Sequence, residues 1–548
     1  MTAPPGGSVY DAREHGLVGD GVTNDQPALA ALVDRLGDAA VRDGLGRVIY
    51  CPPGNYAIHD VGTVWRSRVS LIGAGPGVTR FLLGNPGNPG ASVPLAFHTT
   101  QQHGAGPDNH TADCTFAGFE IDGTGVEMTE YDVLAKGLGL QYVLRGRFRD
   151  LYIHHTAATG FGCDFLQDTV VEGLVVVGCG RLDNGQQMGG AGIGVGIGGW
   201  GPDERFSVTG CVARGNGTNG IFVELQKDYW PPPRGIRITA CHTEDNRFGI
   251  SDWGADGIIV SGCVMVGNHE AGYDVSAHGT AGVAGRGGIV TGCLVDGNFA
   301  DGVSIGNSTG PYTVAGNRIS RNGRYGFRQH NIHRGDENES GGIVVDGNDI
   351  WGNGLDGVHI DAGLSDATVL DNRIRDNGRR CEPATSGGGP TVGYGRLSLT
   401  DTAADWRPDG HLGKTVTVGS RTATVASNTA TELRLTPVRP GVTTAWHGEP
   451  PESGAGYELP DAPAHRAGIT VAAPTRGLQI RGNRIWDGQR SPTQSYALWL
   501  TAAGRGPAAV LDNDLAGNAV AATRFDCGPG DGRWDRNRGL AAEPPPTG

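Results

Sequence analysis

The sequence predicts an all-β protein, a single-stranded right-handed parallel β-helix whose coils of about two dozen residues stack into a solenoid. Three observations predict this fold. Glycine contributes 95 of 548 residues, about 17% against a usual share of roughly 7%. Apolar content is ordinary at 38%, so the chain can bury a core instead of staying disordered. A short phrase that ends in Cys or Asn recurs along the chain.

The recurring phrase sets a register from coil to coil. Its Cys or Asn stands at positions 211, 241, 263, 293, 317, 348 and 372, with later copies at 483 and 513. One coil cannot bury its own apolar side chains, but coils stacked about 4.8 Å apart share a continuous core. We interpret this column as inward turns where Asn side chains bond along the stack and Cys fills the same slot. A disulfide or metal ladder is the alternative.

The N-terminal segment, residues 1–60, is expected to cap the stack. Asp25 and Pro27 open a helix. Its apolar residues fall on one face and are Leu29, Leu32, Val33, Leu36 and Ala40. An end coil needs such a cover because its strand edges are otherwise unpaired. The β-helix is expected over residues 61–382, with final coils over 465–525 and an irregular tail over 526–548.

This region also carries a family resemblance. Residues 11–25 (DAREHGLVGDGVTND), the helix, and residues 48–56 (VIYCPPGNY) resemble the N-terminal signature of the pectin-lyase-like β-helix superfamily. That superfamily includes polysaccharide lyases, glycoside hydrolases, mannuronan epimerases and phage tailspikes. The resemblance implies the β-helix fold and a glycan partner, and it does not select one reaction.

Residues 391–460 interrupt the coils. A Ser/Gly/Pro-rich linker, residues 383–390, precedes segments in which polar and apolar residues alternate, as antiparallel strands require. We expect a small inserted antiparallel β domain that serves as a binding module, a groove wall or a spacer.

Charge and composition exclude several partners. The net charge of −14 disfavours nucleic acid and anionic membranes, because both are bound through Lys and Arg. No apolar run of about 18 residues exists, and residues 1–8 do not read as a signal peptide. A glycan substrate favours an extracellular role, and a cytoplasmic location stays open. The oligomeric state is not indicated, and a homotrimer stays open.

Candidate functional residues follow from the register. Side chains alternate along a strand, so the second and fourth residues after each coil's repeated glycine point to the same outward side. The fourth position holds Asp164, Gly196 and Glu224 on successive coils. The glycines at 194, 196, 198 and 199 are expected to leave a hollow between the two carboxylates.

Asp164 and Glu224 form the predicted acid–base pair. Two coils separate them by about 9–10 Å, near the roughly 6.5–9.5 Å of inverting glycosidases and well above the retaining spacing of about 5–5.5 Å. Trp253, Tyr229 and Trp230 offer flat faces on which sugar rings stack. The sequence therefore predicts hydrolysis of a glycosidic bond in a groove along the β-helix, without a cofactor or a resident metal.

A second group of residues keeps other functions open. Its second-line catalytic candidates are Asp252, Asp274, His330, His359 and Asp361, and its substrate-binding candidates are Arg328 and His278. A polysaccharide lyase or uronan C5-epimerase needs a base and a cation that stabilises an enolate, which Arg328 with His330 or His359 could supply. Ca²⁺ could bind the same residues, although no fixed ligand spacing matches. A non-catalytic, tailspike-like glycan-binding protein is the alternative of another class.

The phrase around Asp164 resembles one particular member of the superfamily. Residues 160–164 (GFGCD) are similar to the catalytic phrase of mannuronan C5-epimerases. Leu166 stands where that family has a histidine, and Gly196 stands where its next carboxylate is expected. Only Asp164 carries over, which disfavours epimerase chemistry at this position.

Overall fold

The protein is described from a computed structural model that covers residues 9–59, 62–98, 104–128, 132, 134–180, 190–227, 229–275, 286–306, 310–330, 340–361, 363–503, 507–527 and 532–540. Its internal contacts divide the chain into two compact units. The first comprises Met1–Asn246 and Asp252–Ile259, and the second comprises Arg247–Ser251 and Val260–Gly548. Each unit is described by itself. Among the described residues, no helix combines the length and apolarity that crossing a bilayer requires.

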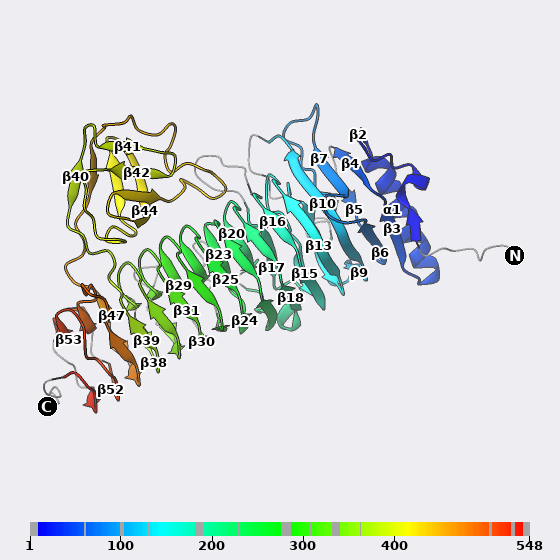
Figure 1. Ribbon diagram of the computed structural model, residues 1–548. Coiled ribbons are helices and arrows are strands. Elements are labelled where there is room, and N and C mark those ends of the chain that lie inside the picture. The colour runs from blue at the N-terminus through cyan, green and yellow to red at the C-terminus, as the bar shows by residue number, and fades with distance from the viewer. Residues whose placement is uncertain are drawn as a thin grey trace. The chain divides into compact units, whose positions relative to one another are not determined.

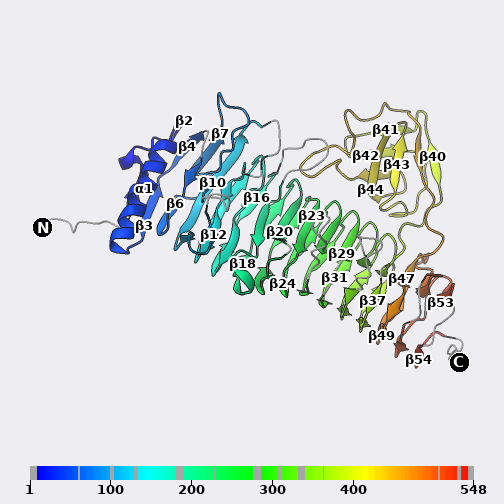
Figure 2. The ribbon, with the colours of Figure 1, turned by 180° about the vertical axis from the view of Figure 1, so that it is seen from behind.

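A helix covers the first coil of the first unit. Helix α1 (Gln26–Asp43) buries one face, and the buried residues are Leu29, Leu32, Val33, Leu36, Gly37 and Ala40. It lies against β3 (Arg47–Cys51) and β6 (Val69–Gly73) (Figures 1 and 2). The helix ends at Gly44, whose φ of 76° is left-handed and whose N–H bonds the Ala40 carbonyl. The predicted capping helix is confirmed.

Each later coil of the first unit contributes three strands. One coil forms β18 (Arg205–Thr209), β19 (Val212–Arg214) and β20 (Asn219–Leu225). The next coil places β21 (Gly235–Thr239) beside β18 and β22 (His242–Glu244) beside β19, both parallel and in register. Other strands of this unit are β10 (Thr115–Gly125), β12 (Gln141–Leu144), β13 (Arg147–His154), β14 (Asp164–Gln167), β15 (Thr169–Glu172), β16 (Val175–Val177) and β17 (Ile193–Ile197). The predicted right-handed parallel β-helix is confirmed.

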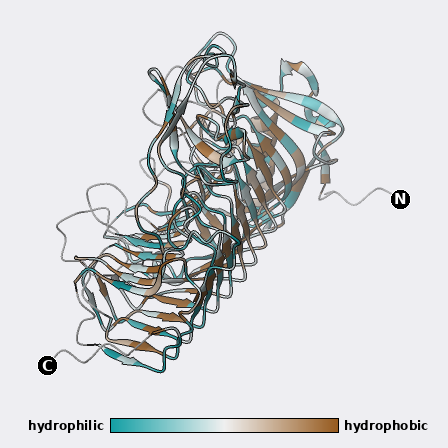
Figure 3. Cartoon of the chain, turned by 60° about the vertical axis from the view of Figure 1, so that its left-hand side comes forward, coloured by the Kyte–Doolittle hydropathy of each residue, from teal (hydrophilic) through white to brown (hydrophobic). Residues whose placement is uncertain are grey.

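The second unit repeats the same pattern. Strands β26 (Ala271–Val275), β29 (Asp301–Gly306), β32 (Phe327–His330) and β36 (Val358–Ile360) pair in parallel order. Apolar positions recur from one strand to the next (Figure 3). Strand β36 then pairs directly with β47 (Ala467–Val471). The insertion between them therefore leaves the register of the coils unbroken.

Asparagine ladders run inside the coils. In the predicted column each amide nitrogen donates to the next amide oxygen at 2.9–3.0 Å, through Asn317, Asn348, Asn372, Asn483 and Asn513. The structure extends the column by one step to Asn537, which was not predicted. Cys293 occupies the same column, and its backbone N–H donates to Asn317 Oδ1 at 2.9 Å. All ten cysteines are free thiols, eight of them buried. The interpretation of this column as a structural ladder is confirmed.

The inserted block is a seven-stranded antiparallel sheet around its own core. Its strands are β40 (Thr385–Gly387), β41 (Val392–Tyr394), β42 (Ser398–Asp401), β43 (Thr415–Val418), β44 (Arg421–Asn428), β45 (Glu432–Leu435) and β46 (Tyr457–Leu459). Trp446, Leu399 and Tyr457 are buried in it. The expected linker contributes β40, which pairs with β46. Alternation of polar and apolar residues did not predict β40, because its three residues, Thr-Ser-Gly, include no apolar side chain. A Cβ on Gly387 would lie 2.6 Å from Tyr457 Cε1, so only glycine fits against that ring.

One lysine joins the two ends of this block. Lys414 Nζ donates to the carbonyl oxygens of Glu382, at 2.6 Å, and Pro460, at 2.7 Å. The Lys414 side chain is buried, and burial lowers its pKa to about 8. The chain therefore leaves the coils and returns to them at one place.

Candidate functional site

Strand pairing in the first unit places the two predicted carboxylates in one column. Gln141 of β12 pairs with Asp164 of β14, and Phe161 pairs with Ile193 at the start of β17. Gly196 of β17 then pairs with Glu224 of β20. Asp164, Gly196 and Glu224 thus occupy the same position on successive coils, on the side facing away from the buried isoleucines and valines.

Three donors hold the Asp164 carboxylate. Its Oδ2 lies 3.3 Å from both Lys136 Nζ and Gln141 Nε2, and its Oδ1 accepts the Gly196 N–H at 2.9 Å. The side chains of Lys136 and Asp164 are only 10% and 13% exposed. Lys136 also donates to the Gly162 carbonyl at 2.9 Å, which fixes its position. Lys136 was not predicted, because it stands directly before the repeated glycine of its coil and not at the second or fourth position after it.

A glutamine stands between the two carboxylates. Gln226 Nε2 donates to Glu224 Oε2 at 2.9 Å. Gln226 Cδ and Asp164 Oδ1 each lie 3.0 Å from the place that a Cβ on Gly196 would take. The prediction of a hollow at these glycines is therefore wrong. Neighbouring side chains fill it, and glycine is needed there so that they can approach the backbone.

Aromatic rings border this site. Tyr142 and Phe165 pack against each other with ring centroids 4.6 Å apart, and Trp200 and Trp230 pack around them. Both Tyr142 and Phe165 have left-handed backbones, with φ of 55° and 58°. Bulky residues adopt this conformation rarely and under strain, and such strain often marks functional sites. The three residues predicted to stack sugars have different surroundings. Tyr229 is 76% exposed, Trp253 packs edge-on against Phe222, and Trp230 belongs to the aromatic cluster.

Glu204 is a buried carboxyl group behind the aromatic cluster. Its Oε2 accepts the N–H groups of Gly198, at 2.9 Å, and Trp200, at 3.2 Å. Burial raises the pKa of Glu204 to about 8, and the negative charge of Asp164 acts in the same direction. Glu204 is therefore mostly protonated at neutral pH. No sequence pattern singled it out, since it precedes a strand in a connecting turn.

The later candidates lie in the second unit and form ion pairs and hydrogen bonds. Arg328 Nη2 lies 2.6 Å from Asp361 Oδ2, and its Nη1 lies 3.7 Å from Asp301 Oδ2. His359 Nδ1 lies 2.7 Å from Asp356 Oδ2. Arg328 of β32 and His359 of β36 pair in one sheet, as their spacing predicted. Asp361 follows directly after β36 instead of standing on the strand, and its N–H donates to the Gln329 carbonyl at 3.0 Å.

His330 differs from the other residues of this sheet. Its Nε2 lies 2.7 Å from Ser304 Oγ. Burial lowers the pKa of His330 to about 4, helped by the positive charge of Arg328. The imidazole is therefore neutral at neutral pH and is a weaker base than an exposed histidine.

The remaining predicted residues have different surroundings. Asp252 is fully buried, and its Oδ1 accepts the Ala255 N–H at 2.9 Å. Asp274 is 3% exposed. His278 lies outside the described residues. The structure thus brings Asp164 and Glu224 together in one unit, and Arg328, His330, His359 and Asp361 together in the other.

One group of side chains has the composition of a metal site. Ligand atoms of Glu120, Asp122 and His154 lie within 4.8 Å of one another. Arg80 already pairs with Glu120 at 2.7 Å and with Asp122 at 3.2 Å. A cation at this place would meet the guanidinium, so the group fits an ion-pair network better than a metal.

Comparison with known proteins shows which fold class this is. The chain has the right-handed parallel β-helix fold. A family model described as periplasmic copper-binding protein (NosD) matches residues 211–388. A sequence search of curated proteins finds no match.

Solved structures are similar at low identity. The catalytic unit of a GH87 α-1,3-glucanase from Streptomyces thermodiastaticus is 16% identical, with a TM-score of 0.51, over 69% of this chain and 64% of that one. The A-module of mannuronan C-5 epimerase AlgE4 from Azotobacter vinelandii is 14% identical, with a TM-score of 0.42, over 96% and 99%. The Dettilon tailspike protein is 12% identical, with a TM-score of 0.41, over 94% and 68%. At these identities the likeness is one of fold.

Proposed function

We propose that this protein is a glycan-active enzyme that hydrolyses a glycosidic bond, with Asp164 and Glu224 as its acid–base pair. The supporting observation is the strand register, which gives these carboxylates the same outward position two coils apart. The glucanase of similar fold acts on a glucan by its printed name, which is consistent with a carbohydrate substrate here.

The separation of the carboxylates favours inversion at the anomeric carbon. Two coils correspond to about 9–10 Å, at the upper end of the roughly 6.5–9.5 Å of inverting enzymes. The Gln226 side chain, which fills the space between the carboxylates, would have to turn aside to admit the attacking water. Asp164, which accepts hydrogen bonds from three donors, would take the proton of that water. Glu224, next to the Gln226 amide, would protonate the leaving oxygen. The exposed ring of Tyr229 would support a sugar ring.

The test is digestion of a glycan panel followed by mass spectrometry of the products. Asp164→Asn and Glu224→Gln should each lower kcat by about 10²–10⁴-fold on the glycan that is cleaved. Glu172→Gln, an exposed carboxylate of β15, is the matched control and should retain full turnover. Retained turnover in the Asp164 or Glu224 variant would contradict the assignment. Binding of a glycan without cleavage would indicate a tailspike-like binding protein.

A lyase or C5-epimerase centred on Arg328, His330 and His359 is the second candidate. The proximity of Arg328, His330 and His359 on neighbouring strands favours it, because such chemistry needs a base and a cation together. The low pKa of His330 disfavours it, because that imidazole is a weak base. The pairing of Arg328 with Asp361 disfavours it, because that guanidinium is already neutralised. A lyase would release unsaturated products that absorb in the ultraviolet, and an epimerase would change neither chain length nor absorbance.

A further inference from the structure

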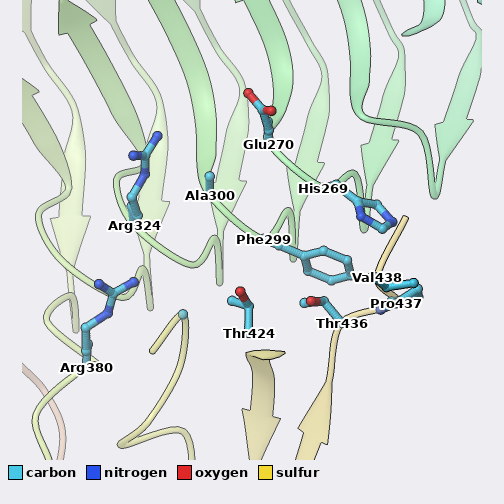
Figure 4. A pocket seen from close by; sticks show the side chains of 11 residues that line it. His269, Glu270, Phe299, Ala300, Arg324, Arg380, Thr424, Thr436, Pro437 and Val438 are labelled. Atoms are coloured by element: carbon cyan, nitrogen blue, oxygen red, sulfur yellow. The ribbon is translucent and has the colours of Figure 1, made fainter. Parts of the chain in front are cut away.

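A cavity of about 460 Å³ lies in the second unit, where the inserted block meets the turns that precede β26, β29 and β32 (Figure 4). Arg324 and Arg380 stand on one side, His269 on the other, and Phe299 between them. Thr424 and Thr436 enter from the inserted block. The volume falls within the roughly 300–1,000 Å³ typical of small-molecule sites.

Arg380 supplies the charge of this cavity. Its Nη2 donates to the Gly323 carbonyl at 2.7 Å, and its Nε donates to the Leu412 carbonyl at 3.0 Å. Burial lowers the pKa of Arg380 to about 10, with a contribution from Arg324. Within the described part of the chain, no carboxylate lies at ion-pair distance from Arg380. A guanidinium has five N–H donors, so donors remain for a ligand.

The other charged residues of the cavity are already paired. Arg324 binds both carboxylate oxygens of Asp301, at 3.1 and 2.7 Å. Glu270 lies 2.6 Å from Arg247. The net charge of the cavity is therefore that of Arg380, in a chain whose net charge is −14. Among the residues that the structure describes, Arg380 is a half-buried cation without a counter-ion within 4 Å, which favours an anionic ligand.

The remaining walls suit a hydroxylated ring. His269 and Phe299 meet edge to face with centroids 5.1 Å apart and provide an apolar surface. The hydroxyl groups of Thr424 and Thr436 can both donate and accept hydrogen bonds. Gly413 completes the enclosure: a Cβ there would lie 2.2 Å from Arg380 Nη2 and 2.3 Å from the Gly323 carbonyl oxygen. Only glycine lets the inserted block come this close to the coils.

We propose that this cavity binds an acidic sugar, a hydroxylated ring that carries a carboxylate or a sulfate, with Arg380 anchoring the anionic group. The site is separate from Asp164 and Glu224. It gives the inserted block a role in holding ligand together with the coils.

The experiment is isothermal titration of the full chain with four probes: D-glucuronate, D-glucose 6-sulfate, D-glucose and inorganic sulfate. At least one acidic sugar should bind at least tenfold more tightly than both D-glucose and inorganic sulfate. Its binding should weaken as salt is added, because the anchoring interaction is ionic. Equal affinity for D-glucose would overturn the anion anchor, and equal affinity for inorganic sulfate would overturn the assignment to a sugar.

Variants separate the anchor from general effects. Arg380→Gln should lower the affinity for the acidic sugar at least tenfold, whereas Arg379→Gln, the neighbouring arginine outside the cavity, should bind as the parent does. Wild-type affinity in Arg380→Gln would overturn the proposal. If that variant unfolds, Phe299→Ala takes its place, because it leaves Arg380 and its bonds intact. It should also lose at least tenfold, and unchanged affinity would overturn the proposal.

The acid–base variants keep this result distinct from the proposed function. Asp164→Asn and Glu224→Gln should bind the acidic sugar with unchanged affinity, because neither residue lines the cavity. Loss of binding in either variant would overturn the separation of the two sites.

Discussion

At the scale of single residues, Asp164 depends on neighbours that its own repeat does not contain. Its register was predictable because strand alternation fixes which side chains share a side. Lys136 and Gln226 were not, because Lys136 precedes the repeated glycine of its coil and Gln226 lies beyond the fourth position after the repeated glycine of its own coil. The left-handed backbone conformations of Tyr142 and Phe165 also cannot be predicted from a pattern of apolar residues.

Replacing Lys136 tests whether it positions Asp164. Lys136→Met keeps the buried stem but removes the ammonium that lies 3.3 Å from the carboxylate. We expect kcat to fall about tenfold or more, which corresponds to about 1.4 kcal/mol, with KM nearly unchanged. Steady-state kinetics on the glycan identified above check this. Lys136→Arg should restore part of kcat, and a change confined to KM would contradict a positioning role.

Glu204 should make stability depend on pH. Its pKa, about 8 in the folded protein against an ordinary value of 4.5, means that the folded state binds more protons than the unfolded state between these values. Stability should therefore fall as pH rises from about 4.5 to 8, by up to about 1.4 kcal/mol per pH unit. Denaturant unfolding at a series of pH values measures this. Glu204→Gln should flatten the profile, and Glu172→Gln should leave it unchanged.

At the scale of elements, the ladders explain why the coils stay in register. The sequence showed one Cys/Asn column, and the structure contains a second through Asn268, Asn298, Asn322, Asn353, Asn377 and Gln494. The sequence carries a signal for the second column too, because most of its asparagines stand four residues before the repeated glycine of their coil. Its chemistry is the same: each amide bridges two coils and satisfies buried backbone groups.

Removing one step of the second ladder should be costly. Asn322→Ala leaves Asn298 Nδ2 and the Asn298 N–H without the oxygen that they bond at 2.9 and 3.1 Å. Two buried donors without acceptors should lower the free energy of unfolding by about 2–4 kcal/mol. Thermal or denaturant unfolding measures the loss. Asn88→Ala, at an exposed position, is the control, and equal stability of the two variants would contradict a structural role for the ladder.

At the scale of the whole molecule, repeats predict architecture better than they predict sites. The solenoid, the capping helix and the inserted block were predicted from periodicity, because each coil must bury the same pattern of apolar side chains against its neighbours. The cavity at Arg380 did not follow, because it joins residues around position 270 to residues around position 436. Contacts of this kind depend on how the inserted block packs against the coils, and no local sequence pattern predicts that packing.

Replacing residues 384–459 by a short Gly/Ser linker should leave the coils folded. Strand β36 already pairs with β47, and β39 (Arg373–Arg375) already pairs with β50 (Arg484–Trp486), across the insertion. We expect the β-sheet circular dichroism of the coils to persist and the Arg380-dependent binding to disappear. Loss of cooperative unfolding in the shortened chain would show instead that the block stabilises the solenoid.

The Lys414 contact has a consequence for the exchange of inserted domains in proteins of this fold. A single ammonium group bridges the carbonyl groups at both boundaries of the block. The first and last residues of the block therefore lie close together where it joins the coils. A different module with adjacent termini could be spliced in here without disturbing the stack beneath. Diversity among relatives, and opportunities for engineering, should therefore concentrate at this junction.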